Sequence, residues 1–112
     1  MIRSVLMCAL SVTLFSPARA TAATPEDGAR VYTAQKCSMC HAVAGKGNPK
    51  GALDDVGRRL TADDIRLWLT SPKEMAAKHS AQRKPPMKSF ATLPKDDIDS
   101  LVTYLMTLKA AK

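Results

Sequence analysis

Residues 36–43 (KCSMCHAV) constrain this chain more than any other segment, because two cysteines stand three positions apart and a histidine directly follows the second. These residues are Cys37, Cys40 and His41, and the only other cysteine is Cys8 near the N-terminus. Thiols and imidazoles at such spacing bind metals, form redox disulfides or carry a covalently attached cofactor. The rest of the chain therefore has to fold around one chemical site.

The first twenty residues have the pattern of a secretory signal peptide. Arg3 supplies the positive charge, residues 5–15 form an apolar run, and residues 18–20 (Ala-Arg-Ala) are a small-x-small cleavage site. The apolar run is shorter than the about 20 residues that a membrane span requires. We therefore expect an exported, periplasmic protein whose mature chain has no membrane span.

Residues 21–112 are the expected mature domain, with cleavage after Ala20 and a site after Ala23 as the alternative. Cleavage after Ala20 leaves 112 − 20 = 92 residues, which is room for one domain with a small core. Cys8 is lost with the signal, so the mature chain retains only the two cysteines of the 36–43 segment. This count excludes a conventional disulfide framework.

Helix signals recur along the mature domain, whereas no alternating run rich in β-branched or aromatic residues predicts a strand. Residues 24–27 (TPED) predict the start of a helix that runs to about Lys36. Residues 61–64 resemble a capping box that opens a second helix, which Pro72 ends, and residues 71–74 predict a third helix with its own capping box.

The last segment carries the clearest helical periodicity. Its apolar residues recur every three or four positions, as in an amphipathic helix that buries one face: Ile98, Leu101, Val102, Leu105 and Leu108. Glycines and prolines predict loops over residues 44–55 and 84–93. The sequence thus predicts an all-α domain in which long loops enclose something.

The Cys-x-x-Cys-His pattern suits covalent attachment of one haem. About one helical turn separates the two sulfurs, so Cys37 and Cys40 both reach vinyl groups, and the imidazole of His41 binds the iron. A zinc site would need four ligands, and the mature chain adds only His79, without paired spacing. A thioredoxin-like disulfide would need a parallel sheet, for which no strand is predicted. Chance occurrence is the remaining alternative.

The chain resembles class I monohaem c-type cytochromes over nearly the whole mature domain. The motif lies near the mature N-terminus, as in that family, and the family's helix-packing residues are matched by Gly28, Tyr32, Leu101, Tyr104 and Leu105. Because glycine has no side chain, Gly28 lets the last helix approach the first. The resemblance implies a small cytochrome c-like fold, with helices and long loops wrapped around one covalent haem c, and an electron-transfer function.

Met87 is the expected second axial ligand of the iron. Pro85 and Pro86 stiffen the loop that presents it, and its thioether is a soft, neutral ligand that favours ferrous iron. A methionine in this loop is also the distal ligand in the family. The alternatives are Met75 and Met106, both expected in the core.

Three further side chains are weighed as haem contacts. Met39 lies inside the attachment loop and is not expected to reach the far side of the iron. His79 would give a bis-histidine site, but its polar neighbours favour a surface position. Trp68 is expected either in the core or donating its indole N–H to a haem propionate.

Two features of the family's haem environment have more than one candidate here. The family's proline whose carbonyl accepts from the proximal histidine is missing from residues 51–53 (GAL), so the acceptor for His41 is expected to be Ala52 or Pro49. The resemblance also places Arg58 and Arg59 where either one meets a propionate.

These observations predict a periplasmic electron carrier, a monomer, and not an enzyme. The alternatives are a cytochrome subunit of a periplasmic dehydrogenase and a haem enzyme or sensor with an open iron site.

The precursor's net charge is +7, loss of Arg3 and Arg19 leaves +5, and two propionates would reduce it to roughly +3. Nucleic acid is a poor partner for an exported chain. Redox partners with acidic surfaces suit the lysines near the cysteine motif and near Met87: Lys36, Lys46, Lys50, Lys84 and Lys88.

Overall fold

The computed structural model describes residues 22–111, so the predicted signal peptide, residues 1–20, lies outside the described part. The described helices are α1 (Pro25–Ala34), α2 (Val56–Arg59), α3 (Ala62–Thr70), α4 (Pro72–Lys78) and α5 (Lys95–Met106), and two 3₁₀ turns are η1 (Cys37–Met39) and η2 (Pro49–Gly51). Two strands, β1 (Ala42–Val43) and β2 (Lys46–Gly47), form an antiparallel pair. The expectation of an all-α domain rich in loops is confirmed in outline.

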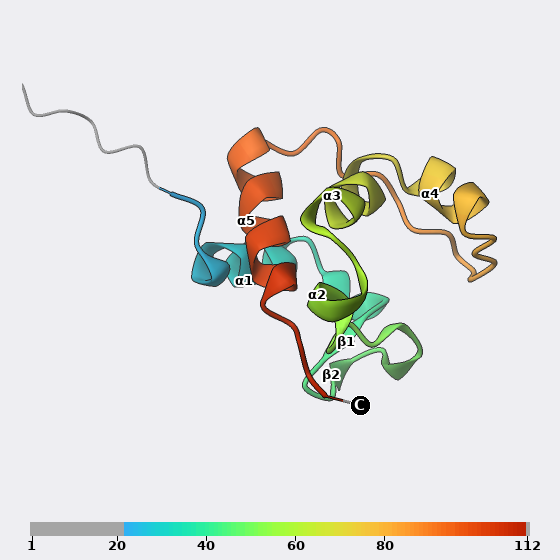
Figure 1. Cartoon of the computed structure of the whole chain (residues 1–112), viewed down its shortest axis with the longest axis horizontal. Helices are drawn as coiled ribbons and strands as arrows, with labels where there is room; N and C mark the ends of the chain where they lie inside the picture. The colour runs from blue at the N-terminus through green and yellow to red at the C-terminus, as the bar shows by residue number, and fades with distance from the viewer. Residues whose placement is uncertain (1–21, 112) are drawn as a thin grey trace, which may run out of the picture.

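The first and last helices pack against each other, and α1 and α5 lie side by side (Figure 1). A side chain at Gly28 would overlap the carbonyl of Ser100 and the Cβ of Tyr104, so only glycine permits this approach. Tyr32 then meets Tyr104 edge-to-face, with ring centroids 5.7 Å apart. The predicted packing of these two helices is confirmed.

Side chains at two helix N-termini satisfy backbone N–H groups as the sequence predicts. Thr24 Oγ1 accepts from the Asp27 N–H at 3.1 Å at the start of α1. Thr61 and Asp64 form a complete capping box at α3. The box predicted at α4 is wrong, because Ser71 makes no side-chain cap bond there. Its backbone N–H instead continues α3 by donating to the Leu67 carbonyl at 2.7 Å.

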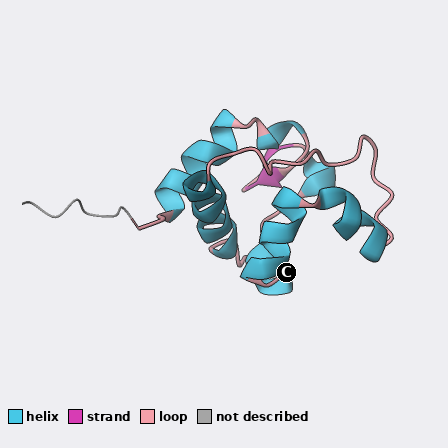
Figure 2. Ribbon diagram, turned by 90° about the horizontal axis from the view of Figure 1, so that it is seen from above, coloured by secondary structure: helices cyan, strands magenta, loops and turns pink. Residues whose placement is uncertain are grey.

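Short regular elements lie within and beside the predicted loop at residues 44–55. The short β1–β2 pair appears as a small strand region among helices and loops in Figure 2, and α2 follows it. Two-residue strands and a four-residue helix are too short to produce a periodic pattern in the sequence. Backbone bonds also join these elements to other segments: Leu53 N–H donates to Ala42 O, and Gly57 N–H donates to Leu108 O.

The core lies where α1, α3 and α5 meet. Its buried members are Tyr32, Val56, Ile65, Leu69, Phe90, Ile98, Leu101, Val102 and Leu105. The buried face of α5 follows the predicted stripe, and Leu108 packs against the core just beyond the helix end. Trp68 is half-buried and outside this cluster, so the expectation of a core position is wrong. None of the helices within residues 22–111 is long and apolar enough to span a membrane.

Candidate haem-attachment site

The cysteine motif forms a single tight turn directly after α1. The carbonyl of Cys37 accepts from the Cys40 N–H at 3.1 Å and from the His41 N–H at 2.9 Å. Both thiols are free; Cys37 is half-buried against the core and Cys40 is exposed. The turn therefore places two unpaired thiols and an imidazole within one short segment that spans from core to surface.

His41 is oriented by a carbonyl of the following loop. Its Nδ1 lies 3.0 Å from the Gly51 carbonyl, and a donor at Nδ1 leaves Nε2 as the acceptor that a metal would use. The sequence pointed to Ala52 or Pro49 as the acceptor, and both are wrong. The η2 turn instead presents the carbonyl of its last residue, Gly51, while Ala52 is bridged to Ala42.

The surroundings favour the uncharged forms of these groups. Burial is the main cause that lowers the pKa of His41, and the Arg83 guanidinium lowers it further, while the hydrogen bond to Gly51 raises it. Burial raises the pKa of the Cys37 thiol, and Lys88 opposes this effect. A neutral imidazole with a free ring nitrogen is the form that binds iron.

Met87 lies half-buried against the core on the loop between α4 and α5, residues 79–94, hereafter the methionine loop. The C-terminal end of this loop is fixed to α3, because the Phe90 N–H donates to the Leu69 carbonyl at 2.7 Å and Ser89 Oγ donates to the Thr70 carbonyl at 3.0 Å. Two prolines precede Met87 and limit its backbone freedom. The thioether is thus held on a segment that borders the core.

The same loop reaches the cysteine motif through two cationic side chains. Arg83 donates from Nη2 to the Cys40 carbonyl at 2.5 Å. Lys88, directly after Met87, lies close enough to Cys37 to lower the pKa of the thiol, and its Nζ stands 5.1 Å from the Phe90 ring centroid. The structure therefore brings the methionine loop and the cysteine motif together. Sequence reasoning missed Arg83, whose only signal was a cation just before the two prolines.

The competing side chains lie elsewhere. Met75 is buried in α4 and Met106 packs against the core from α5, as the sequence predicts. Met39 is 71% exposed within the attachment turn. His79 is exposed, as expected, and stacks on Trp68 with ring centroids 6.0 Å apart.

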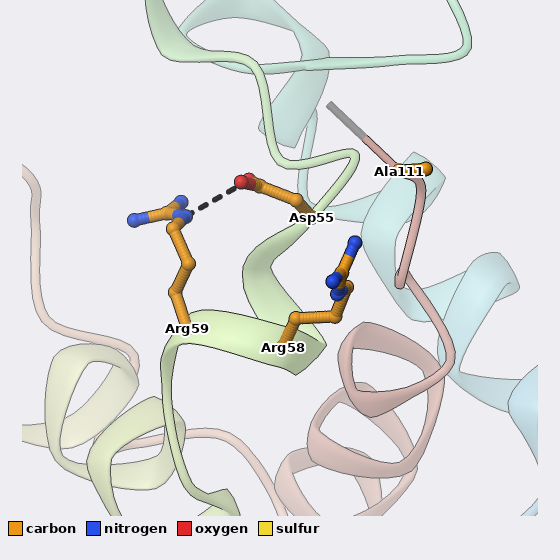
Figure 3. Close-up of a pocket in the computed structure, with 4 residues that line it drawn as sticks. All are labelled: Asp55, Arg58, Arg59 and Ala111. Atoms are coloured by element: carbon orange, nitrogen blue, oxygen red, sulfur yellow. Dashed lines mark hydrogen bonds and ion pairs between the residues drawn. The ribbon is translucent and has the colours of Figure 1, made fainter.

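Arg58 and Arg59 extend from α2 into a shallow pocket lined also by Asp55 and Ala111 (Figure 3). Arg59 Nε lies 2.9 Å from Asp55 Oδ1, and Arg58 Nη1 donates to the Ala110 carbonyl at 3.3 Å. Neither the two cysteines nor His41 lines this pocket. A contact between either arginine and a haem propionate stays a prediction.

The rival chemistries of the cysteine motif gain no support. Within residues 22–111, no three His, Cys, Asp or Glu side chains gather as ligands of a metal ion, as zinc would require. The two thiols form no disulfide, and the one sheet of the described chain is the antiparallel pair β1–β2.

Comparison with protein families decides the class of the chain. The model of the family described as Cytochrome c matches residues 25–109, which contain every element described above. The chain belongs to the cytochrome c family. Searches of curated proteins and of solved structures returned no match. Family membership makes this cytochrome a haem-c electron-transfer protein.

The residues of this cytochrome fit a covalently bound haem. Two free thiols and an oriented imidazole occupy one turn, and the partly buried Val43, Leu53 and Leu93 border the core together with Met87. The hydroxyl of Tyr32 is buried and has no hydrogen-bond partner within residues 22–111; burial raises its pKa to about 12 and Cys37 contributes to the shift. Apolar side chains of this kind suit contact with a haem ring.

Proposed function

We propose that Cys37 and Cys40 bind one haem c through thioether bonds, that His41 and Met87 are its axial ligands, and that the protein is a periplasmic one-electron carrier. The observation that carries this proposal is the 3.0 Å hydrogen bond between His41 Nδ1 and the Gly51 carbonyl. It fixes the ring plane and the tautomer, and it leaves Nε2 as a ligand.

The choice of Met87 as second ligand is supported by its position and by the positions of the other methionines. Met75 is only 4% exposed inside α4, and Met39 is 71% exposed between the two cysteines. Met87 is half-buried on the loop that contacts the cysteine motif through Arg83. A neutral thioether stabilises ferrous iron relative to an anionic ligand, which suits a carrier of relatively high potential.

The bound haem supplies the one-electron chemistry, and this chain's residues hold it in place. His41 and Met87 would both hold the iron, and with two ligands from the chain no position would be left for a substrate. This arrangement favours an electron carrier over a haem enzyme or a ligand sensor.

A free monomer is favoured over a dedicated subunit of a dehydrogenase. The large hydrophobic side chains exposed within residues 22–111 are Met39 and Leu67, which belong to separate elements. A permanent interface would be expected to expose a larger contiguous apolar patch. Export of the protein is supported by the signal-like residues 1–20.

Transient partners with acidic surfaces suit the charge around the site. The cations near the motif and the methionine loop are all exposed: Lys36, Lys46, Lys50, Lys84 and Lys88. Such a group attracts acidic surfaces at low salt, and the attraction weakens as salt is added.

Absorption spectroscopy of the purified holoprotein tests the proposal. We expect an alkaline pyridine haemochrome typical of two thioether bonds and the weak near-infrared band of methionine-ligated ferric haem. Met87→Ala should lose that band, bind carbon monoxide readily when reduced and have a lower reduction potential. Met39→Leu is the matched control and should keep the band. A Met87→Ala variant that retains the band would show that another methionine is the ligand.

A further inference from the structure

We infer that Arg83 is a positioning residue for Met87, because its guanidinium ties the loop that carries the methionine to the backbone of the cysteine motif. The inference rests on the proposed His41 and Met87 ligation. In this inference the exposed Arg83 helps to keep the Met87 thioether at the iron.

The guanidinium of Arg83 lies where the cysteine motif meets the η2 turn. Nη2 donates to the Cys40 carbonyl at 2.5 Å. A Cβ at Gly51 would overlap both Arg83 Nη1 and the Cys40 carbonyl, so the absence of a side chain at Gly51 makes room for this contact. Gly51 is also the residue whose carbonyl orients His41. The methionine loop and the histidine support thus meet at one place.

The contact is the main polar restraint on the N-terminal half of the methionine loop. Among the described residues, it is the one hydrogen bond made by residues 82–88. Residues 82–86 are all exposed, so packing adds little restraint there. At the other end, Ser89 and Phe90 hold the loop to α3. Met87 therefore sits between two anchors, and Arg83 is the anchor nearer to the cysteines.

The fork shape of the side chain matters as well as its charge. Arginine presents several N–H groups in one plane, so one nitrogen bonds to Cys40 while another covers Gly51. Lysine has a single nitrogen and would retain only one of these contacts. Lys84, the next residue, is an exposed cation of the same loop that makes no hydrogen bond or ion pair within residues 22–111. Lys84→Ala is therefore a matched control for loss of charge without loss of the tie.

Imidazole competition on the ferric holoprotein tests the inference. Added imidazole displaces a loosely held methionine, and the near-infrared methionine band reports the displacement. Loss of one hydrogen bond worth about 1 kcal/mol corresponds to about a fivefold lower imidazole concentration at half-displacement in Arg83→Ala. Arg83→Lys should lie between this variant and the wild type, and Lys84→Ala should stay within about a factor of two of the wild type.

Each outcome is decisive for the inference. An Arg83→Ala midpoint within a factor of two of the wild type would overturn it, as would a Lys84→Ala shift as large as that of Arg83→Ala. Thermal unfolding of the haem-loaded variants should show only small changes, since the residue is exposed. A wild type that lacks the methionine band would overturn Met87 ligation itself, a failure that is seen before any variant is compared.

Discussion

Gly28 sets the distance between the first and last helices. A Cβ at this position would overlap the Ser100 carbonyl and the Cβ of Tyr104. The Ser100 carbonyl is part of the α5 backbone, so it cannot move aside as a flexible side chain could. The resemblance to class I c-type cytochromes implied this role, because a glycine has no side chain to separate the two helices. The structure adds the atoms that impose it.

Gly28→Ala should lower the free energy of unfolding by about 1–3 kcal/mol, because the added methyl forces α1 and α5 apart. Denaturant unfolding of the holoprotein measures the change. Ala34→Leu adds more volume at an exposed position of the same helix and should stay within about 0.5 kcal/mol of the wild type. Equal effects of the two substitutions would contradict the packing argument.

Helix ends show which local signals the chain uses. The capping box at α3 forms as the sequence predicts, whereas the similar pattern at α4 does not, because Ser71 closes α3 before α4 begins. No gap separates the two helices, so the backbone N–H of Ser71 is already bonded to the Leu67 carbonyl. The Ser71 backbone also lacks the extended conformation of a capping residue. A capping pattern in the sequence predicts a cap correctly only where the preceding helix does not already use the capping residue.

Alanine substitutions at Thr61 and at Ser71 distinguish the formed cap of α3 from the absent cap of α4. Thr61→Ala should lower the free energy of unfolding by about 1 kcal/mol, since it leaves the Asp64 N–H without its acceptor. Ser71→Ala should change it by only a few tenths of a kcal/mol, because no cap bond is lost. Chemical denaturation of both variants provides the comparison. A larger loss from Ser71→Ala than from Thr61→Ala would contradict the observed caps.

For the molecule as a whole, an ion-pair network joins α3 to α5. Asp99 lies 2.7 Å from Arg66 and 2.6 Å from Lys95, and the hydrogen bond from Lys95, followed by that from Arg66, lowers the pKa of the carboxyl below its usual 3.8. Because the folded-state pKa is depressed, the network stabilises the fold above pH 3.8 and this contribution is lost as the pH falls through the folded-state pKa.

Asp99→Asn should therefore unfold at a lower temperature than the wild type near neutral pH, and the two midpoints should converge in acid well below pH 3.8. Thermal unfolding followed by far-UV circular dichroism over a pH series measures this. Asp96→Asn removes an exposed first-turn carboxylate of the same helix that has no ion pair within residues 22–111, so it loses only a helix-dipole contribution and should fall less than Asp99→Asn. A constant gap between Asp99→Asn and the wild type at every pH would contradict the network's role.

Short-range signals were enough for the main helices and for the class of the site. Periodicity, caps and prolines predicted α1, α3 and α5, and the spacing of Cys37, Cys40 and His41 predicted haem attachment, because each depends on residues a few positions apart. The strands β1 and β2 and the helix α2 escaped prediction because they are too short to carry a pattern, and α2 also has a backbone bond to the distant Leu108.

The sequence by itself determined which thiols and which imidazole the chain offers, and that a stiff loop presents Met87. Only the tertiary structure decided that the Gly51 carbonyl orients His41 and that Arg83 joins the methionine loop to Cys40. The physical reason is the range of the interactions. Attachment chemistry needs neighbours within one turn, whereas the hydrogen bonds made by His41 and Arg83 join residues 10 and 43 positions apart, whose partners are fixed only when the chain has folded.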